Sequence, residues 1–146
     1  MGLTAALGAG PVAIDTAIFI YLVEEHPVFL SAARSLFVKA DHGGLEIVTS
    51  AVTLLEVLVI PFRVGNDALA ARYEAILTNS RGIRLMEIDR AQLRMAARFR
   101  AAYRMRTPDA LQLAAALSTG CSSLVTNDRR LPSVPGLQVL QLSDFV

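Results

Sequence analysis

The chain has 146 residues, of which 53% are hydrophobic, enough to bury one core and too few for two well-formed domains. This composition excludes an intrinsically disordered chain, and the single cysteine, Cys121, excludes an intrachain disulfide. A net charge of +1 does not by itself mark a nucleic-acid-binding protein. The charge is unevenly distributed, however, because residues 81–106 contain eight arginines and two acidic residues and carry +6, whereas the rest of the chain carries −5.

The first 23 residues contain a single charged side chain, Asp15. A secretory signal would need a basic stretch before its apolar core, and none is present here. A membrane helix would place Asp15 near its middle at a cost of about 2.5–3.5 kcal/mol. We therefore expect no membrane insertion and a cytoplasmic location, to which the lone cysteine also conforms. Residues 1–10 are expected to form a flexible leader, followed by a single domain over residues 11–146.

Apolar runs, capping residues and turn residues predict alternating strands and helices. In chain order these are a strand over 12–14, helices over 16–23 and 27–40, a strand over 45–49, helices over 51–60 and 67–78, a strand over 83–88, helices over 90–104 and 107–119, and strands over 122–126 and 137–142. Proline at position 61 is expected to end the third of these helices, over residues 51–60. The alternation favours a three-layer α/β/α domain in which helices cover both faces of a parallel sheet.

Four acidic residues occupy positions that such a fold uses for chemistry. Asp15 and Asp128 each follow a predicted strand, and the carboxyl ends of parallel strands form the usual site in α/β sheets. Asp109 lies in the first turn of a helix, and Glu56 lies within an otherwise apolar helix. Each has a simpler interpretation: Asp15 caps the next helix, Asp109 complements a helix dipole, Asp128 makes a turn, and Glu56 lies at an exposed edge.

Glu56 is the hardest of the four to explain structurally. Its neighbours at i−4 and i+4 are Val52 and Ile60, so no polar stripe passes through it. A buried carboxylate without a partner is costly, which suggests a hydrogen-bonded or cationic partner. If the four acids meet, their repulsion favours a divalent cation. Oxygen ligands without matching histidines or thiols favour Mg²⁺ or Mn²⁺ over zinc.

Four short motifs in register over nearly the whole chain resemble those of PIN-domain nucleases, and within them the toxin ribonucleases of VapBC type. They are Ala13-Ile14-Asp15-Thr16, Leu54-Leu55-Glu56-Val57, Thr107-Pro108-Asp109-Ala110 and Leu124-Val125-Thr126-Asn127-Asp128. The sequence departs from the family where Arg129 and Arg130 follow the last motif. Some members carry a further acidic residue near that point, so the resemblance leaves open whether one or two metal ions bind.

The resemblance implies a PIN-like fold and Mg²⁺- or Mn²⁺-dependent hydrolysis of RNA. Asp15, Glu56, Asp109 and Asp128 would be catalytic. Of these, Asp15, Asp109 and Asp128 would hold the metal, with Thr16 and Thr126 supporting them by hydrogen bonds. It also implies a homodimer and a cognate antitoxin, as in type II toxin–antitoxin pairs. Two alternatives stay open: a non-catalytic PIN-like module that binds RNA or protein, and a PIN nuclease that acts in RNA processing or on DNA.

The helix predicted over residues 90–104 is amphipathic. Five arginines, including Arg94 and Arg98, fall on one arc of its helical wheel. The side chains on the opposite arc are expected to face the core: Met95, Phe99, Ala102 and Tyr103. Arg94 and Arg98 are candidate RNA contacts, because arginine pairs well with phosphate oxygens. The alternative is a solvated helix face in a chain that has thirteen arginines and one lysine.

Overall fold

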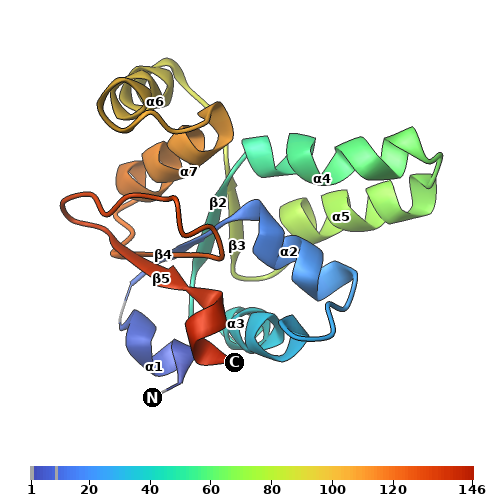
Figure 1. The fold of residues 1–146 in the computed structure, drawn as a ribbon. Coiled ribbons are helices and arrows are strands. Elements are labelled where there is room, and N and C mark those ends of the chain that lie inside the picture. The colour runs from blue at the N-terminus through green and yellow to red at the C-terminus, as the bar shows by residue number, and fades with distance from the viewer. Residues whose placement is uncertain (1, 9) are drawn as a thin grey trace.

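The computed structural model describes residues 2–8 and 10–146, and within them a five-stranded parallel sheet forms the centre of the molecule (Figure 1). The strands are β1 Val12–Ile14, β2 Ile47–Ser50, β3 Ile83–Met86, β4 Ser123–Thr126 and β5 Gln138–Gln141. Their order across the sheet is β3-β2-β1-β4-β5, and every neighbouring pair is parallel. This confirms the predicted parallel α/β architecture.

Helices connect the strands and cover both faces of the sheet. They are α1 Leu3–Leu7, α2 Thr16–Val23, α3 Leu30–Asp41, α4 Val52–Arg63, α5 Asp67–Asn79, α6 Arg90–Tyr103, α7 Thr107–Ser118 and the 3₁₀ helix η1 Leu142–Phe145. Helix α7 packs on the sheet and α6 packs on α7, whereas α2, α3 and α5 lie on the other side (Figure 1). None of the helices within residues 2–8 and 10–146 combines the length and apolar character that a membrane span requires.

The two faces of the sheet are separated by the alternation of side chains along each strand. Val12 and Ile14 of β1 point into the larger core beneath α2 and α3, whereas Ala13 between them belongs to a second core against α7. Because both faces are covered, every residue of β1, β2 and β4 is buried, as expected for the central strands of a parallel sheet. This burial on both sides holds the strand ends rigidly in place.

The strand order reverses direction between β1 and β4. From β1 the chain builds β2 and β3 outward on one side, and it later returns to add β4 and β5 on the other. Such a reversal opens a crevice at the carboxyl ends of the two adjacent strands. Residues that directly follow β1 and β4 therefore face a common space, and Asp15 and Asp128 lie in these segments.

The prediction of a flexible leader over residues 1–10 is wrong for residues 3–7, which form α1. Leu3 and Leu7 are buried in the larger core, and α1 packs against α3. A sequence of small residues gave no sign of this because the contact is a long-range one. Residues 1 and 9 of the predicted leader lie outside the described residues.

Two helix boundaries near prolines also differ from expectation. Helix α4 continues through Pro61 to Arg63, although we expected it to stop near the proline. Pro61 lies in the last turn, where it removes a single i→i−4 hydrogen bond close to the end of the helix, and its ring is buried. Helix α3 begins at Leu30, three residues after Pro27, because residues 27–29 form a turn in which the backbone N–H groups of Val28 and Phe29 donate to Nδ1 of His26.

Candidate functional site

Asp15 lies at the end of β1, where the sheet places it beside the end of β4. Its backbone N–H donates to the carbonyl of Val125 at 3.1 Å, which continues the strand pairing. One carboxylate oxygen, Oδ1, accepts from the N–H of Thr16 at 2.7 Å and so caps α2. The other, Oδ2, accepts from the hydroxyl of Thr126 at 2.8 Å. Asp15 therefore caps a helix with one oxygen and joins the two strand ends with the other.

Glu56 projects from α4 toward the first turn of α2. It is half-buried, and its Oε1 accepts a hydrogen bond from the hydroxyl of Thr16 at 2.6 Å. The sequence analysis expected a partner for Glu56, and that partner is the hydroxyl of Thr16, which is itself a residue of the predicted site. Thr16 links the two acids directly, because its N–H donates to Asp15 and its side chain donates to Glu56.

A buried hydrogen-bond network also contacts the hydroxyl of Thr16. The amide of Gln112 on α7 donates to the hydroxyl of Thr53 at 2.7 Å, and Thr53 lies 3.1 Å from the hydroxyl of Thr16. The hydroxyl of Thr53 also lies 2.8 Å from that of Thr49, which donates to the carbonyl of Ile14 at 2.9 Å. Sequence reasoning missed Thr53 and Gln112. The signal available was their spacing, three residues from Glu56 and from Asp109 respectively.

Asp128 follows β4 and is held by its own segment. Its backbone N–H donates to the hydroxyl of Thr126 at 3.0 Å, and its Oδ1 accepts from the backbone N–H of Arg130 at 2.9 Å. The guanidinium of Arg130 binds both carboxylate oxygens, with Nε on Oδ1 and a terminal nitrogen on Oδ2, each at 2.9 Å. The simple interpretation of Asp128 as a turn residue therefore holds together with a position in the site.

Asp109 is buried in the first turn of α7. The helix begins at Thr107, with Arg106 rather than Thr107 as the N-cap and no side-chain cap hydrogen bond. The Nε of Arg106 donates to Oδ2 of Asp109 at 3.3 Å. Asp109 thus also satisfies the simpler interpretation, an acid near a helix N-terminus.

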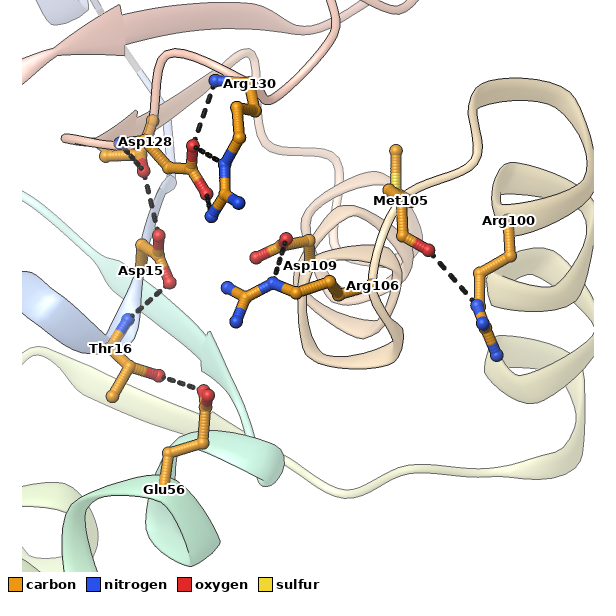
Figure 2. A network of polar contacts seen from close by, with 10 residues as sticks. Asp15, Thr16, Glu56, Arg100, Met105, Arg106, Asp109, Asp128 and Arg130 are labelled. Atoms are coloured by element: carbon orange, nitrogen blue, oxygen red, sulfur yellow. Dashed lines mark hydrogen bonds and ion pairs between the residues drawn. The ribbon is translucent and has the colours of Figure 1, made fainter.

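The site forms a pocket of about 440 Å³ at the carboxyl ends of β1 and β4. It is lined by Asp15, Thr16, Ala17, Ile20, Tyr21, Glu56, Arg106, Asn127, Asp128 and Arg130. Three of the four predicted acids line it directly. Asp109 and Thr126 do not line it but contact lining residues, Arg106 and Asp15 respectively. Figure 2 shows side chains of all these segments converging on one space.

The pKa values of Asp15 and Asp128 are shifted in opposite directions by their surroundings. Burial raises the pKa of Asp15; hydrogen bonds from Thr126 and Thr16 act against this shift, and the charges of Asp109 and Glu56 add to it. The hydrogen bonds of Arg130 lower the pKa of Asp128 below its usual range. The charge coupling to Asp15 places Asp109 and Glu56 within electrostatic reach of it. Such divergent carboxyl pKa values are typical of functional sites.

The donor set of the pocket suits a hard divalent cation, because it consists of carboxylate and hydroxyl oxygens. Within residues 2–8 and 10–146, however, no three histidine, cysteine, aspartate or glutamate side chains lie close enough together to hold an ion. Arg106 and Arg130 contact two of the acids instead. The residues fit a metal by chemistry. Ligation by Asp128 requires Arg130 to move, because Arg130 binds both carboxylate oxygens, and ligation by Oδ2 of Asp109 requires Arg106 to move.

The orientation of α6 agrees only in part with the prediction. Its N-cap is Asp89, and Arg94 and Arg98 are exposed. Met95 and Phe99 pack against the smaller cores, but Ala102 and Tyr103 are exposed, which corrects the prediction that they face the core. Helix α6 packs chiefly on α7, and the side chains of its last turn lie outside that contact.

Solved structures share this fold. VapBC2 from Rickettsia felis, bound to a DNA fragment from its promoter, matches with a TM-score of 0.70 and 16% identity, covering 90% of this chain and 98% of that chain. A toxin–antitoxin complex from Klebsiella pneumoniae matches with a TM-score of 0.64 and 22% identity over 86% and 94% of the two chains. VapC20 from Mycobacterium tuberculosis, a Sarcin-Ricin loop cleaving toxin, matches with a TM-score of 0.64 and 17% identity over 77% and 86%.

At these identities the likeness establishes the fold. A search of curated proteins gives no match. The sequence itself matches the family model described as PIN domain over residues 12–137, which runs from the start of β1 to the residue before β5 and so includes all four acids. This chain therefore belongs to the PIN domain family.

Proposed function

We propose that the chain is a Mg²⁺- or Mn²⁺-dependent endoribonuclease that hydrolyses RNA phosphodiester bonds as the toxin of a type II toxin–antitoxin pair. The observation that carries the proposal is the pocket at the ends of β1 and β4. Asp15, Glu56 and Asp128 line it although they are far apart in sequence, and Asp109 lies beside it. A cluster of acids at this edge of a parallel sheet serves cation-assisted phosphoryl chemistry better than it serves stability.

In this proposal, Asp15, Asp109 and Asp128 hold the divalent ion. When bound, the ion neutralises charge on the phosphoryl oxygens and makes the attacking water more acidic. Thr16 and Thr126 orient Asp15, since each donates to a different oxygen of its carboxylate. The raised pKa of Asp15 fits a carboxylate whose charge a cation would stabilise.

Glu56 is suited to orient the attacking water or accept its proton. Its Oε1 is occupied by the hydroxyl of Thr16, and the hydrogen-bond network through Thr53 fixes that hydroxyl from the other side. This leaves Oε2 as the oxygen that can accept from a water in the pocket. The network thus holds a base in one orientation next to the proposed metal ligands.

A protein partner is supported by exposed apolar side chains on and just after α4, with exposed fractions of 41–68%. They are Leu55, Val59, Ile60, Phe62 and Val64. By their spacing of four and three residues, Leu55, Val59 and Phe62 share one face of α4, and exposed apolar surface of this kind marks interaction sites in soluble proteins. We propose a cognate antitoxin and a second copy of the chain as the partners, in a cytoplasmic protein. The similar folds of the toxin–antitoxin complexes from Rickettsia felis and Klebsiella pneumoniae support this assignment.

A second candidate is a PIN domain that binds RNA without cutting it. The contacts of Arg106 with Asp109 and of Arg130 with Asp128 favour it, because they neutralise two of the four acids without a metal. The two candidates differ in metal dependence, since a binding module does not require a divalent ion.

The deciding experiment is cleavage of single-stranded RNA in Mg²⁺ by the wild type and by Asp15→Asn. Asparagine keeps the size of the side chain and removes its charge, and we expect cleavage to fall by about 10²–10⁴-fold. Asp41→Asn is the matched control, because Asp41 is exposed at the end of α3. Chelation by EDTA is expected to abolish wild-type cleavage. Full activity of a folded Asp15→Asn protein would contradict the assignment, and a wild type that binds RNA without cutting it would support the second candidate.

A further inference from the structure

Arg130 makes an unusually complete contact with a proposed metal ligand. Its guanidinium binds both oxygens of Asp128, and its backbone N–H donates to one of them. The side chain of Arg130 is nevertheless 76% exposed, whereas that of Asp128 is 18% exposed. The arginine therefore covers the acid from the solvent side and has little packing of its own to hold it there.

Arg106 makes a similar contact on the other side of the pocket. Its Nε lies 3.3 Å from Oδ2 of Asp109, and the side chains are 61% and 10% exposed respectively. Both arginines line the pocket together with Asp15 and Glu56. Figure 2 shows the two guanidinium groups reaching into the space between Asp15, Asp109 and Asp128. They are the cations that this chain itself brings to the acidic pocket.

The neighbouring Arg129 shows that this placement is specific. Arg129 is also exposed, but it points away from the pocket and pairs with Asp144 at 2.7 Å and with the hydroxyl of Ser143 at 3.1 Å. Two adjacent arginines of equal charge thus have different partners, one on a proposed metal ligand and one on η1. This provides a control in which charge is removed without touching the pocket.

Resting on the proposed function, we propose that Arg106 and Arg130 are phosphate-binding residues that occupy Asp109 and Asp128 until metal and RNA displace them. A guanidinium and a divalent ion compete for the same carboxylate oxygens, so a metal on Asp128 releases Arg130, and a metal on Oδ2 of Asp109 releases Arg106. The planar fork that binds a carboxylate with two N–H groups fits the two non-bridging oxygens of a phosphodiester equally well. Once released, each arginine lies beside the proposed position of the scissile phosphate.

The first half of the proposal is tested by titrating the metal-free protein with Mn²⁺ in a calorimeter. In Arg130→Gln we expect Mn²⁺ to bind about two- to fivefold more tightly than in the wild type, the scale of an exposed ion pair. Arg129→Gln removes the same charge from the adjacent position and is expected to leave the affinity within error. Equal affinities in the two variants would overturn the proposal. Thermal melts confirm that both variants are folded.

The second half is tested by the salt dependence of binding to single-stranded RNA, measured in the Asp15→Asn background, where cleavage is not expected. Loss of one phosphate contact lowers the slope of log K against log salt by about 0.7. We expect this decrease for Arg130→Gln, no decrease for Arg129→Gln, and an intermediate affinity for Arg130→Lys, which keeps the charge without the fork. Arg106→Gln is expected to behave like Arg130→Gln. Unchanged slopes in both arginine variants of the pocket would overturn the proposal.

Failure of this inference is distinguishable from failure of the proposed function. A wild type that cleaves RNA in Mg²⁺, together with an Arg130→Gln variant of unchanged metal affinity and salt slope, overturns only the role of the arginines. A wild type that neither binds Mn²⁺ nor cleaves RNA overturns both.

Discussion

Charged side chains are concentrated in two regions of this molecule, and the regions differ in whether these side chains have hydrogen-bond or ion-pair partners. In the pocket at the ends of β1 and β4, each of the four acids has a hydrogen-bond or ion-pair partner at 2.6–3.3 Å. On the surface of α6, Arg90, Arg94 and Arg98 are exposed, and within residues 2–8 and 10–146 none of them forms an ion pair.

The difference shows what positions a charged group. A sheet that is buried on both faces fixes the position of the residues at its strand ends. Asp15 therefore cannot move away from Thr126 or Glu56 without disturbing the core. Arginines on an exposed helix face move freely, and water and salt screen them. We therefore expect substitutions in the pocket to change stability and chemistry, and substitutions on α6 to change only long-range attraction to nucleic acid.

The largest effect on stability is expected from Thr53→Val, which cuts the network behind Glu56. Valine has the same shape as threonine but leaves the buried amide N–H of Gln112 without its acceptor, and the Thr16 hydroxyl keeps only its bond to Glu56. We expect the free energy of unfolding to fall by about 1–3 kcal/mol, measured by urea denaturation. RNA cleavage should fall as well, because Glu56 loses its fixed orientation.

Thr78→Val is the matched control for this substitution. Thr78 is exposed on α5 and donates only to the carbonyl of Glu74. We expect its loss to change stability by less than about 0.5 kcal/mol and to leave cleavage unchanged. If the two variants lost equal stability, the buried network would have no special role and the contrast between the regions would weaken.

A second test uses the sign of a pH effect in the metal-free protein. The pKa of Asp15 in the folded protein lies above its ordinary value of 3.8, mainly because of burial, so the folded state binds the proton more tightly than the unfolded state. The ionised carboxylate therefore destabilises the fold once the pH rises through the folded-state pKa. We expect Asp15→Asn to raise the melting temperature at neutral pH, although it removes activity.

This gain should vanish as the pH falls to about 3.8 and below, where the carboxyl is protonated in both states. Thermal melts of the wild type and Asp15→Asn between pH 3 and pH 8, in EDTA, measure the difference. A variant that is less stable than the wild type at neutral pH would show that the hydrogen bonds of Asp15 outweigh the cost of burying its charge.

The smallest effect is expected from Arg94→Gln/Arg98→Gln on α6. If both side chains contact phosphates, the slope of log K against log salt for single-stranded RNA falls by up to about 1.4, with stability within about 0.5 kcal/mol of the wild type. Arg63→Gln/Arg72→Gln removes two exposed charges from α4 and α5 and is the control. Equal slopes in the two double variants would leave α6 as a solvated helix face.

Local signals predicted most of the fold. Asn66 and Asp89, at the starts of two predicted helices, cap them through their side-chain oxygens, and the strands that precede Asp15 and Asp128 form where apolar runs indicated. These features depend on a few neighbouring residues, which is why a sequence reveals them. The simpler interpretations of Asp15, Asp109 and Asp128 as local cap, dipole and turn residues also hold, together with their positions at the pocket.

Other features depended on contacts between distant segments. The helix over Leu3–Leu7 forms because its leucines reach the core against α3. Pro61 remains inside α4 because its ring is buried in the last turn of the helix. The partner of Glu56 is Thr16, 40 residues away, and no pattern around Glu56 indicates which hydroxyl would meet it.

The amino-acid sequence alone determined the alternation of strands and helices, the parallel sheet and the identity of the four acids, because periodicity, capping and strand-end position are properties of short segments. Only the tertiary structure decided how those acids are partnered: Asp15 and Glu56 with threonines, Asp109 and Asp128 with arginines. The physical reason is that hydrogen-bond partners are selected by distances of about 3 Å in space, and chain folding sets those distances after the local elements have formed.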